Sequence, residues 1–428
     1  LSLRRQRQMC IRDRLLINQV GYECDGEKSA LLQCGADLDI RGHVRLLRQQ
    51  DDHLLLETPL VAAGCVPGWQ GRHYWRADFS AFTEPGHYRL EAVVTTEAQE
   101  RLVRSPPFAI GRGLLARRCL SDVIHYFKGQ RASGTFDRAD RRARLFGTDQ
   151  RRDVHGGWFD ASGDMSKYLS HLSYANYLNP QQTPMVVWSL LKCRELLATR
   201  RDIDGMNLCK RLNDEGLHGA DFLCRMQDES GFFYMTLFDK WSKDPEQREL
   251  CAYSTQQGIK SARWQAGFRQ GGGMTIAALA RAAREPSGGD LDTSQYADAA
   301  SRGYLHLREH NLAYLDDRVE NIIDDYCALL AAVELTRTLG AEWLAEARDR
   351  AGRLCARQRA HPDLGHHWAA NDDGSRPYYH AAEAGLPVLA LLEYLAIEPD
   401  PARQWAARTV AEQALAAELA LAARAGNP

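Results

Sequence analysis

Residues 153–168 read DVHGGWFDASGDMSKY, and no other stretch of the 428-residue chain concentrates so much chemistry. Two carboxylates, Asp160 and Asp164, flank a run of small residues, and Gly156 and Gly157 allow a tight backbone bend. Paired carboxylates in such a loop fit a hydrolytic centre, a structural turn with Asx hydrogen bonds, or a calcium loop. The EF-hand pattern is absent from this stretch.

The same stretch carries groups that suit a carbohydrate. Trp158 offers a flat apolar face on which a sugar ring can stack, and His155 and Tyr168 can form hydrogen bonds with hydroxyl groups. Carboxylates beside aromatic rings are what glycoside hydrolysis requires, whereas a turn or a calcium loop does not need the rings. From spacing alone the three interpretations stay open.

Helical periodicity surrounds this stretch from Gly113 onward. The long loop 130–183 that contains it is rich in aromatic residues, including Trp158, Phe159, Tyr168, Tyr174 and Tyr177, which argues against disorder. Apolar residues elsewhere recur at i, i+3, i+4 and i+7. They predict helices over 114–129, 184–200, 206–227, 274–285, 293–313, 321–339, 341–359, 379–396 and 400–425. No sequence repeat is visible, so the pattern favours stacked helical hairpins in a barrel over a solenoid.

From Leu15 to about Ile110 the pattern is that of β-structure. Short alternating segments, such as KSALLQC at 28–34 and GHYRLEAVV at 86–94, are separated by turn residues. About 95 residues with several short strands predict a β-sandwich of immunoglobulin size.

Composition excludes several classes of protein. Lys and Arg total 54 and Asp and Glu total 56, giving a net charge of -2, so general nucleic-acid binding has no support. The longest apolar runs are too short for a transmembrane helix. The 11 cysteines form no C-x-x-C pair, which argues against a zinc ribbon, and we expect free thiols in a reducing compartment.

The first residues, 1–14, read LSLRRQRQMCIRDR and are strongly basic. No apolar segment follows them, so they do not form a secretory signal. We expect a disordered leader, or sequence that is foreign to the natural protein.

At this point the residues show a family resemblance. The run GGWFDASGD at 156–164, with KY after it, resembles the motif of glycoside hydrolase family nine, GGWYDAGD. The opening LLINQVGY at 15–22 resembles the start of the immunoglobulin-like domain that precedes the barrel in that family. The resemblance implies a multidomain β + α fold: an N-terminal immunoglobulin-like β-sandwich over 15–110, followed by an (α/α)6 barrel over 111–428.

Three segments look most similar to the exo-β-D-glucosaminidase branch of the family: 160–188, 233–249 and AYSTQQGIKS at 252–261. The spelling D-A-S-G-D, in place of D-A-G-D, also departs from the cellulases. This implies an oligosaccharide substrate, cytoplasmic breakdown of chito-oligosaccharides, and no cofactor. The alternatives are a β-1,4-glucanase and a non-catalytic carbohydrate-binding protein.

The resemblance also implies roles for individual residues. Asp164 matches the general base of an inverting mechanism, and Asp160 matches the second carboxylate, which helps to hold the water. The family's general acid is a glutamate in the last part of the barrel, which we expect beyond residue 428. Glu383 is the one tempting substitute within the chain. Nine predicted helices against the twelve of an (α/α)6 barrel agree with an incomplete barrel.

Further residues are candidates for binding. Besides the two carboxylates, we predict that five side chains contact substrate: His155, Trp158, Tyr168, Tyr253 and Arg269. A glucosamine ammonium would favour a nearby carboxylate, for which the candidates are Asp153, Asp239 and Asp325. The pair His366-His367 lacks a convincing third ligand, so we expect no metal site. We expect neither a nucleic-acid nor a membrane partner, and the oligomeric state is left open.

Overall fold

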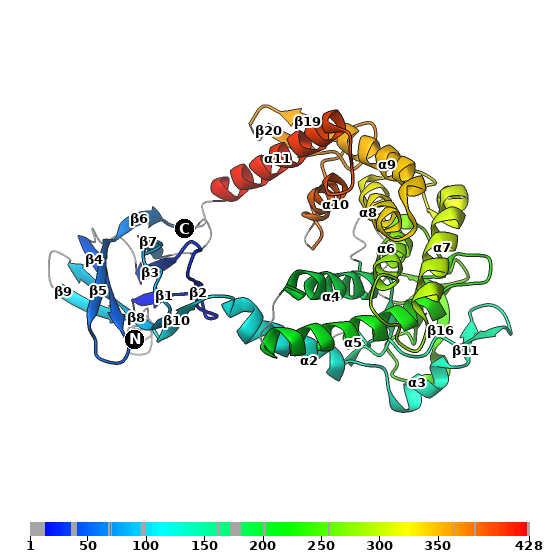
Figure 1. The fold of residues 1–428 in the computed structure, drawn as a ribbon, viewed down its shortest axis with the longest axis horizontal. Coiled ribbons are helices and arrows are strands. Elements are labelled where there is room, and N and C mark those ends of the chain that lie inside the picture. The colour runs from blue at the N-terminus through cyan, green and yellow to red at the C-terminus, as the bar shows by residue number, and fades with distance from the viewer. Residues whose placement is uncertain are drawn as a thin grey trace, which may run out of the picture. The chain divides into compact units, whose positions relative to one another are not determined.

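The computed structural model describes most of the chain: residues 13–35, 41–66, 69, 71–95, 100–160, 163–171, 181–199, 203–255, 257–363, 365–380 and 382–425. The predicted leader up to residue 12, and Tyr174 and Tyr177, lie outside these ranges. The chain divides into two compact units, one of Leu1–Val123 with Glu418–Pro428 and one of Ile124–Ala417 (Figure 1).

Two packed sheets build the first unit and confirm the predicted β-sandwich. A four-stranded sheet has the order β1-β3-β7-β6, and a six-stranded sheet has the order β2-β10-β8-β4-β5 with β9 paired to β8. The strands are β1 (Arg14–Leu16), β2 (Tyr22–Glu23), β3 (Ser29–Gly35), β4 (Arg41–Arg48), β5 (Leu54–Pro59), β6 (Val61–Gly64), β7 (Arg72–Asp78), β8 (Gly86–Thr95), β9 (Glu100–Arg104) and β10 (Phe108–Gly111).

The core of the sandwich lies between these sheets. Leu32 and Ala77 from one sheet and Val44 and Leu90 from the other are all completely buried. Inward residues of both sheets meet in one apolar cluster, as in other aligned sandwiches. Strand β9 was not predicted, because its sequence ERLVR is mostly charged.

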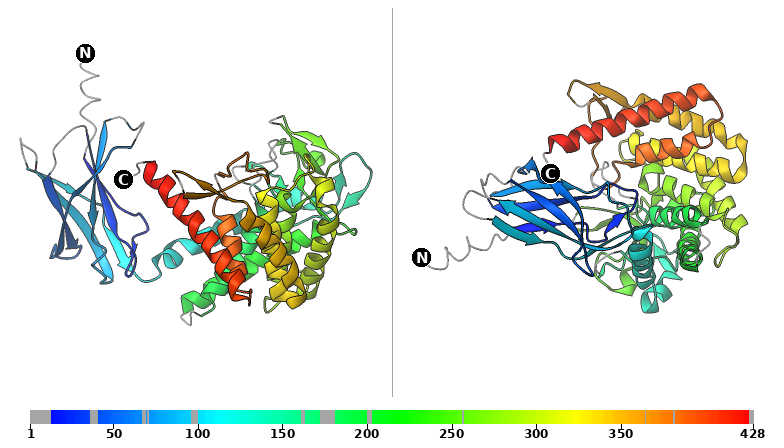
Figure 2. Two further views of the ribbon diagram at one scale, coloured as in Figure 1. Left: turned by 90° about the horizontal axis from the view of Figure 1, so that it is seen from above. Right: turned by 60° about the vertical axis from the view of Figure 1, so that its left-hand side comes forward.

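Helices dominate the second unit (Figures 1 and 2). They are α2 (Ser121–Gly129), which begins just before the unit, α3 (Gly134–Asp140), α4 (Thr183–Leu197), α5 (Ile203–Arg225), α6 (Gly272–Ala282), α7 (Thr293–Tyr314), α8 (Ile322–Leu339), α9 (Leu344–Ala356), α10 (Leu386–Leu395) and α11 (Pro401–Arg424), which extends past the end of the unit. In the parts of the chain that the structure describes, no helix is both long and apolar enough to cross a membrane.

Most predicted helices match these within a few residues, and three differ. The helix predicted over 379–396 begins only at Leu386, because Tyr378 forms a bridge-like backbone bond to the Trp368 carbonyl and Pro387 suits a first turn. The one predicted over 114–129 is divided into a π-helical turn and α2. The one predicted over 341–359 begins with a 3-10 turn ahead of α9.

Helix α6 lies at the centre of the unit. It is buried along its whole length and packs against α4, α5, α7 and α8. A Cβ atom on Gly273 would lie 2.8 Å from the Cβ of Cys327 on α8, so a glycine is required for this close approach. The glycine run at 271–273 therefore serves close helix packing.

A further sheet of six strands, which we did not predict, lies in the second unit and is formed by segments of the long loops. Its order is β12-β11-β16-β15-β13, with β17 paired to β16. The strands are β11 (Ala143–Leu145), β12 (Arg151–Arg152), β13 (Lys167–Tyr168), β15 (Thr236–Phe238), β16 (Glu249–Ser254) and β17 (Ile259–Ser261). Two- and three-residue strands carry too little periodicity to be recognised. Since β13 begins three residues after Asp164, this sheet positions the carboxylate loop.

The predicted tight bend at Gly156-Gly157 is confirmed. Both glycines have positive φ, +83° and +70°. A Cβ atom on Gly157 would lie 2.7 Å from the ring of Phe222, which belongs to α5. The two glycines therefore let the loop lie directly against this helix.

Candidate active site

Three donors surround the carboxylate of Asp164. Its Oδ1 accepts a hydrogen bond from the backbone N–H of Ser166 at 2.9 Å. Its Oδ2 accepts one from the Tyr168 hydroxyl at 2.7 Å and one from the Trp241 indole N–H at 3.1 Å. An ionised carboxylate only accepts hydrogen bonds, so this arrangement holds the charged form in one orientation.

The second carboxylate lies in the same loop. The backbone N–H of Asp160 donates to the carbonyl of Ser166 at 3.1 Å, which closes the turn between the two acids. Burial raises the pKa of Tyr253 to about 12, with the charges of Asp164 and Asp160 adding to the effect. Both carboxylates therefore lie near one tyrosine, Tyr253.

A buried ion cluster anchors this loop from beneath. Asp140, at the end of α3, is completely buried and accepts from Arg248 with both oxygens, at 2.5 and 2.9 Å. The ammonium group of Lys167, also completely buried, lies 2.8 Å from Oδ2 of Asp140. We call Asp140, Lys167 and Arg248 the anchor cluster.

The anchor cluster also holds backbone on both sides of the carboxylates. Lys167 donates to the carbonyls of Val154 at 2.9 Å and Gly156 at 2.7 Å. Arg248 donates to the carbonyl of Met165 at 2.6 Å. Burial lowers the pKa of Lys167 to about 8, while the charge of Asp140 opposes this shift. Lys167 and Arg248 thus hold the backbone just before Asp160 and just after Asp164.

A strained turn places the indole of Trp241. The buried carboxylate of Asp239 accepts from the Ser166 hydroxyl and from the backbone N–H groups of Trp241 and Lys243, each at 3.0 Å. Lys240, Trp241 and Lys243 all have φ between 57° and 59°. Side chains other than glycine adopt such angles only where surrounding contacts enforce them, often at functional sites.

An aromatic cluster lines the site beside Asp164. The rings of Phe238 and Tyr253 stack with centroids 4.4 Å apart, and the ring of Trp241 meets both edge-on. Trp241 is 40% exposed, whereas Tyr253 is 7% exposed. Trp241 is therefore the aromatic group that can meet a sugar next to the carboxylate.

The prediction that Trp158 forms the stacking platform is wrong. Trp158 is only 5% exposed, and its indole N–H donates to the carboxylate of Glu215 at 2.7 Å. Its ring packs edge-on against Phe127 and His218. A tryptophan in an aromatic-rich loop can be a core residue or a sugar-stacking residue, and the sequence does not distinguish the two. Here Trp158 is a core residue.

The prediction that Arg269 binds substrate is also wrong. Its side chain is completely buried, and its guanidinium pairs with Asp317 at 2.7 Å and with Asp324 at 3.3 Å. It also donates to the carbonyl of Val319 at 3.0 Å. Arg269 thus ties the turn before α6 to the start of α8.

Three other predicted contacts have different outcomes. Tyr168 and Tyr253 belong to the Asp164 site, although the Tyr168 hydroxyl donates its proton to Asp164 and so could only accept from a sugar hydroxyl. The ring Nδ1 of His155 lies 2.6 Å from Oδ1 of Asp153. The backbone carbonyl of His155 accepts from Arg225 of α5, so this residue is held on the α5 side of the loop.

Two of the three candidate partners for an ammonium group are already engaged. Asp325 is completely buried and pairs with Arg357 at 2.5 Å and Arg350 at 3.3 Å. Asp239 is completely buried within the turn described above. Only Asp153, with half of its side chain exposed beside His155, has a face open to solvent.

The histidine pair lies on a hairpin of β19 (Gln358–His361) and β20 (Gly365–Trp368), where His366 and His367 point in alternate directions. Within the ranges that the structure describes, no group of three or more His, Cys, Asp or Glu side chains is arranged to hold a metal ion.

Glu383 is buried, and both of its carboxyl oxygens accept hydrogen bonds. One of its oxygens accepts from the Tyr326 hydroxyl and the other from the backbone N–H of Gln181. The residue is 5% exposed, and burial raises the pKa of its carboxyl to about 7. Both oxygens of this carboxyl are therefore engaged by other parts of the chain.

Comparison with known proteins decides the family. The model of the cellulase N-terminal Ig-like domain matches residues 12–97, and that of glycosyl hydrolase family 9 matches residues 117–417. The chain belongs to glycosyl hydrolase family 9. It is therefore an O-glycoside hydrolase, with an immunoglobulin-like domain ahead of a helical domain of the (α/α)6 type.

Solved structures agree on the fold. A family 9 glycoside hydrolase of Bacteroides ovatus is 19% identical, with a TM-score of 0.59 over 94% of this chain and 71% of that one. A metagenome-derived family 9 endoglucanase is 20% identical, with a TM-score of 0.55 over 94% of this chain and 83% of that one. A search of curated protein sequences found no match.

We predict that Trp241→Phe slows this family 9 hydrolase about tenfold in kcat, since one charge-assisted hydrogen bond to Asp164 is lost while the ring stays. Hydrolysis of a glycosyl fluoride measures the change. Trp405→Phe, at a 70% exposed tryptophan of α11, is the matched control and should leave kcat unchanged. Equal rates for both variants would contradict the role of the indole N–H.

We predict that Glu383→Gln changes how stability depends on pH. The folded protein holds the Glu383 proton up to about pH 7 and the unfolded chain only to about 4.5, so the wild type loses stability as the pH rises through this window. Glutamine does not titrate.

Between pH 5 and 8 the variant should therefore gain about 2 kcal/mol relative to the wild type, measured by urea unfolding at each pH. Other groups cancel in the difference. A difference that does not vary with pH would show that Glu383 is ionised in the folded protein.

Proposed function

We propose that this family 9 hydrolase removes glucosamine from β-1,4-linked oligosaccharides with inversion at the anomeric carbon. The observation that carries the catalytic part is the Asp164 carboxylate, held by three donors beside Asp160 and below an exposed indole. Asp164 acts as general base on a water that attacks the anomeric carbon. Asp160 supplies a second acceptor that orients this water.

The choice of an amino sugar follows from the sequence around the site. The D-A-S-G-D spelling and the segments 233–249 and 252–261 resemble the exo-β-D-glucosaminidase branch, and these segments contain Asp239, Trp241 and Tyr253 of the site. The residues that shape the surroundings of Asp164 are thus the ones that carry the resemblance. Among the three candidate carboxylates, Asp153 is the one with an exposed side chain.

Hydrolysis of β-1,4-glucan is the second candidate. It is favoured by the metagenome-derived relative, which is an endoglucanase, and by the engagement of Asp239 and Asp325 in internal contacts. A neutral sugar would not need either carboxylate.

The general acid belongs to the proposal as well. We assign the acid to a side chain other than Glu383, because Glu383 is buried and both of its oxygens already accept hydrogen bonds. A substrate whose leaving group needs little protonation can be hydrolysed without the general acid. Such a substrate therefore tests the general base alone. Fluoride is such a leaving group, whereas the sugar alkoxide of a disaccharide is not.

A cytoplasmic location is part of the same proposal. The ten cysteines in the described ranges are unpaired, and Cys24, Cys34, Cys251 and Cys327 are buried as thiols. Free thiols are usual in reducing compartments. Uptake of short chito-oligosaccharides would then precede their cleavage.

We predict that the chain releases fluoride from β-glucosaminyl fluoride with a kcat/KM about tenfold above that for β-glucosyl fluoride, since polar groups of a site reject an analogue that lacks their partner. Fluoride release followed by an ion-selective electrode gives both values. A larger value for the glucosyl compound would replace the proposed substrate by glucan.

In the same assay Asp164→Asn should lower kcat by about 10²–10⁴ with little change in substrate binding, which is the usual contribution of a general base. Asp298→Asn, at an exposed position of α7, is the matched control. If neither fluoride is hydrolysed by folded wild-type protein, or if Asp164→Asn keeps wild-type turnover, the assignment of the base fails.

A further inference from the structure

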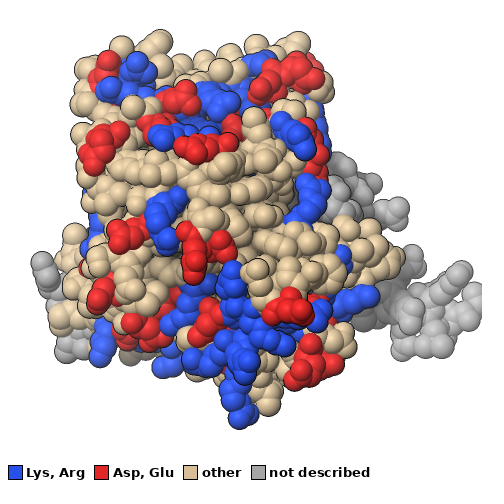
Figure 3. Space-filling view, turned by 90° about the vertical axis from the view of Figure 1, so that its right-hand side faces the viewer, with Lys and Arg blue, Asp and Glu red and all other residues tan. Residues whose placement is uncertain are grey.

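A basic pocket lies in the second unit, on the sheet that carries the catalytic loop. Its volume is about 940 Å³. The lining includes seven basic residues, Arg138, Arg142, Arg144, Arg151, Lys240, Arg248 and Lys260, and only two acidic ones, Glu246 and Glu249. The strands β11, β12, β16 and β17 supply much of the wall. The face of the molecule shown in Figure 3 has a gathering of Lys and Arg in its lower part.

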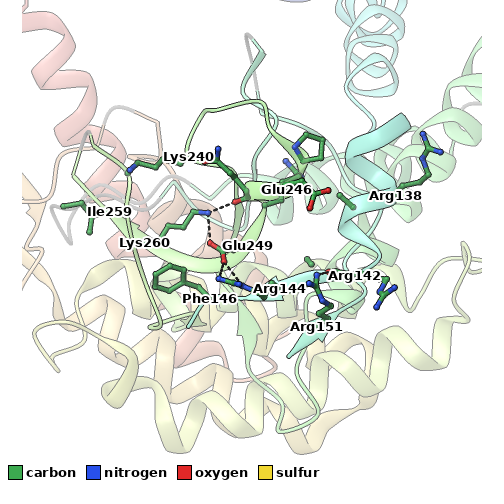
Figure 4. Close-up of a pocket in the computed structure, with 16 residues that line it drawn as sticks. Arg138, Arg142, Arg144, Phe146, Arg151, Lys240, Glu246, Glu249, Ile259 and Lys260 are labelled. Atoms are coloured by element: carbon green, nitrogen blue, oxygen red, sulfur yellow. Dashed lines mark hydrogen bonds and ion pairs between the residues drawn. The ribbon is translucent and has the colours of Figure 1, made fainter. Parts of the chain in front are cut away.

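Part of this charge is neutralised internally. Glu249 pairs with Arg144 at 2.8 Å and with Lys260 at 2.9 Å, as the dashed lines in Figure 4 show. Arg248 is taken up by Asp140 of the anchor cluster. These pairs neutralise Arg144, Lys260 and Arg248. The charges of the other basic side chains are not neutralised by them and can interact with a ligand.

Four basic side chains form no ion pair with any carboxylate that the structure describes: Arg138, Arg142, Arg151 and Lys240. Figure 4 places Lys240 on one side of the pocket and the three arginines on the other. The guanidinium of Arg151 donates to the carbonyl of Arg142 at 2.9 Å, which keeps these two residues together. A chain with a net charge of -2 has no general excess of basic residues, so their concentration here is local.

We propose that this pocket binds a small ligand with two or more phosphate or sulfate groups. Arginine presents a planar fork of donors that fits such oxyanions, and cations on opposite walls suit charges that are separated along the ligand. The volume is large enough for a phosphorylated or sulfated sugar, within the usual range of ligand pockets. A concave pocket of limited size favours a small molecule over a nucleic-acid duplex.

The pocket shares a wall with the catalytic loop. Lys240 precedes Trp241 in the chain, and both have positive φ. Gly258 lines the pocket, and a Cβ atom there would lie 3.0 Å from the rings of Phe238 and Trp241. A ligand held by Lys240 would thus lie directly behind the indole that donates to Asp164.

Calorimetric titration of the whole chain at 0.15 M salt tests the proposal, with inorganic tripolyphosphate and sucrose octasulfate as probes. At this ionic strength attraction from distant charges is screened. We expect at least one probe to bind to the wild type, and the one that binds more tightly distinguishes a phosphate from a sulfate ligand. Replacing Arg142 and Lys240 together by Gln should weaken this binding about tenfold.

The matched control is Arg403→Gln with Arg408→Gln, which removes the same charge from exposed positions of α11 and should leave binding unchanged. Arg151→Gln serves as a second pocket variant should the first one fold poorly. The proposal is overturned if neither probe binds, if control and pocket variants lose binding equally, or if a 16-base-pair DNA duplex binds more tightly than both probes.

Discussion

The position of the Asp164 loop depends on a carboxylate that is completely buried beneath it. Asp140 lies in the interior with Arg248 and Lys167 against it, and these two cations then bind backbone carbonyls on either side of the Asp164 loop. Breaking such a buried pair typically costs 3–5 kcal/mol, because the remaining charge is left without a partner. Because the buried charges must stay paired, Lys167 and Arg248 stay next to Asp140, and their bonds to backbone carbonyls hold the Asp164 loop in position.

A second level of support comes from Asp239. Its three hydrogen bonds stabilise a turn in which three residues adopt unfavourable backbone angles. Each such residue costs of order 1–3 kcal/mol, so the turn exists only because the buried carboxylate enforces it. What the strain provides is the position of Trp241, whose ring is exposed while its N–H reaches Asp164. The site therefore combines rigid charges below with a strained loop above.

Local chemistry was predictable from the sequence, and long-range partners were not. The bend at Gly156-Gly157 and the joint placement of Asp160 and Asp164 follow from residues that are neighbours in the chain. By contrast, Asp140 and Arg248 are 108 residues apart and lie in segments with no periodic pattern. Nothing in either segment indicates the other.

Residue type alone does not distinguish a core residue from a binding residue. Trp158 and Trp241 both lie in loops rich in aromatic residues, yet the first is a core residue because Gly219 leaves space for its ring against α5. Arg269 precedes a helix in a glycine-rich turn, as a ligand-binding arginine would, but it forms an ion pair with the buried Asp324. Only the packing of α5, α6 and α8 distinguishes these cases.

Hydrogen exchange of the backbone amides in residues 160–169 tests the central claim, which is that the anchor cluster holds the catalytic loop in place before substrate arrives. In the wild type the amides of Asp160, Ser166 and Leu169 are hydrogen-bonded and should exchange slowly. In Asp140→Asn they should exchange about 100-fold faster, while amides of α6 and α8 keep their protection. Unchanged exchange in this loop would show that the loop is held by something other than the buried charges.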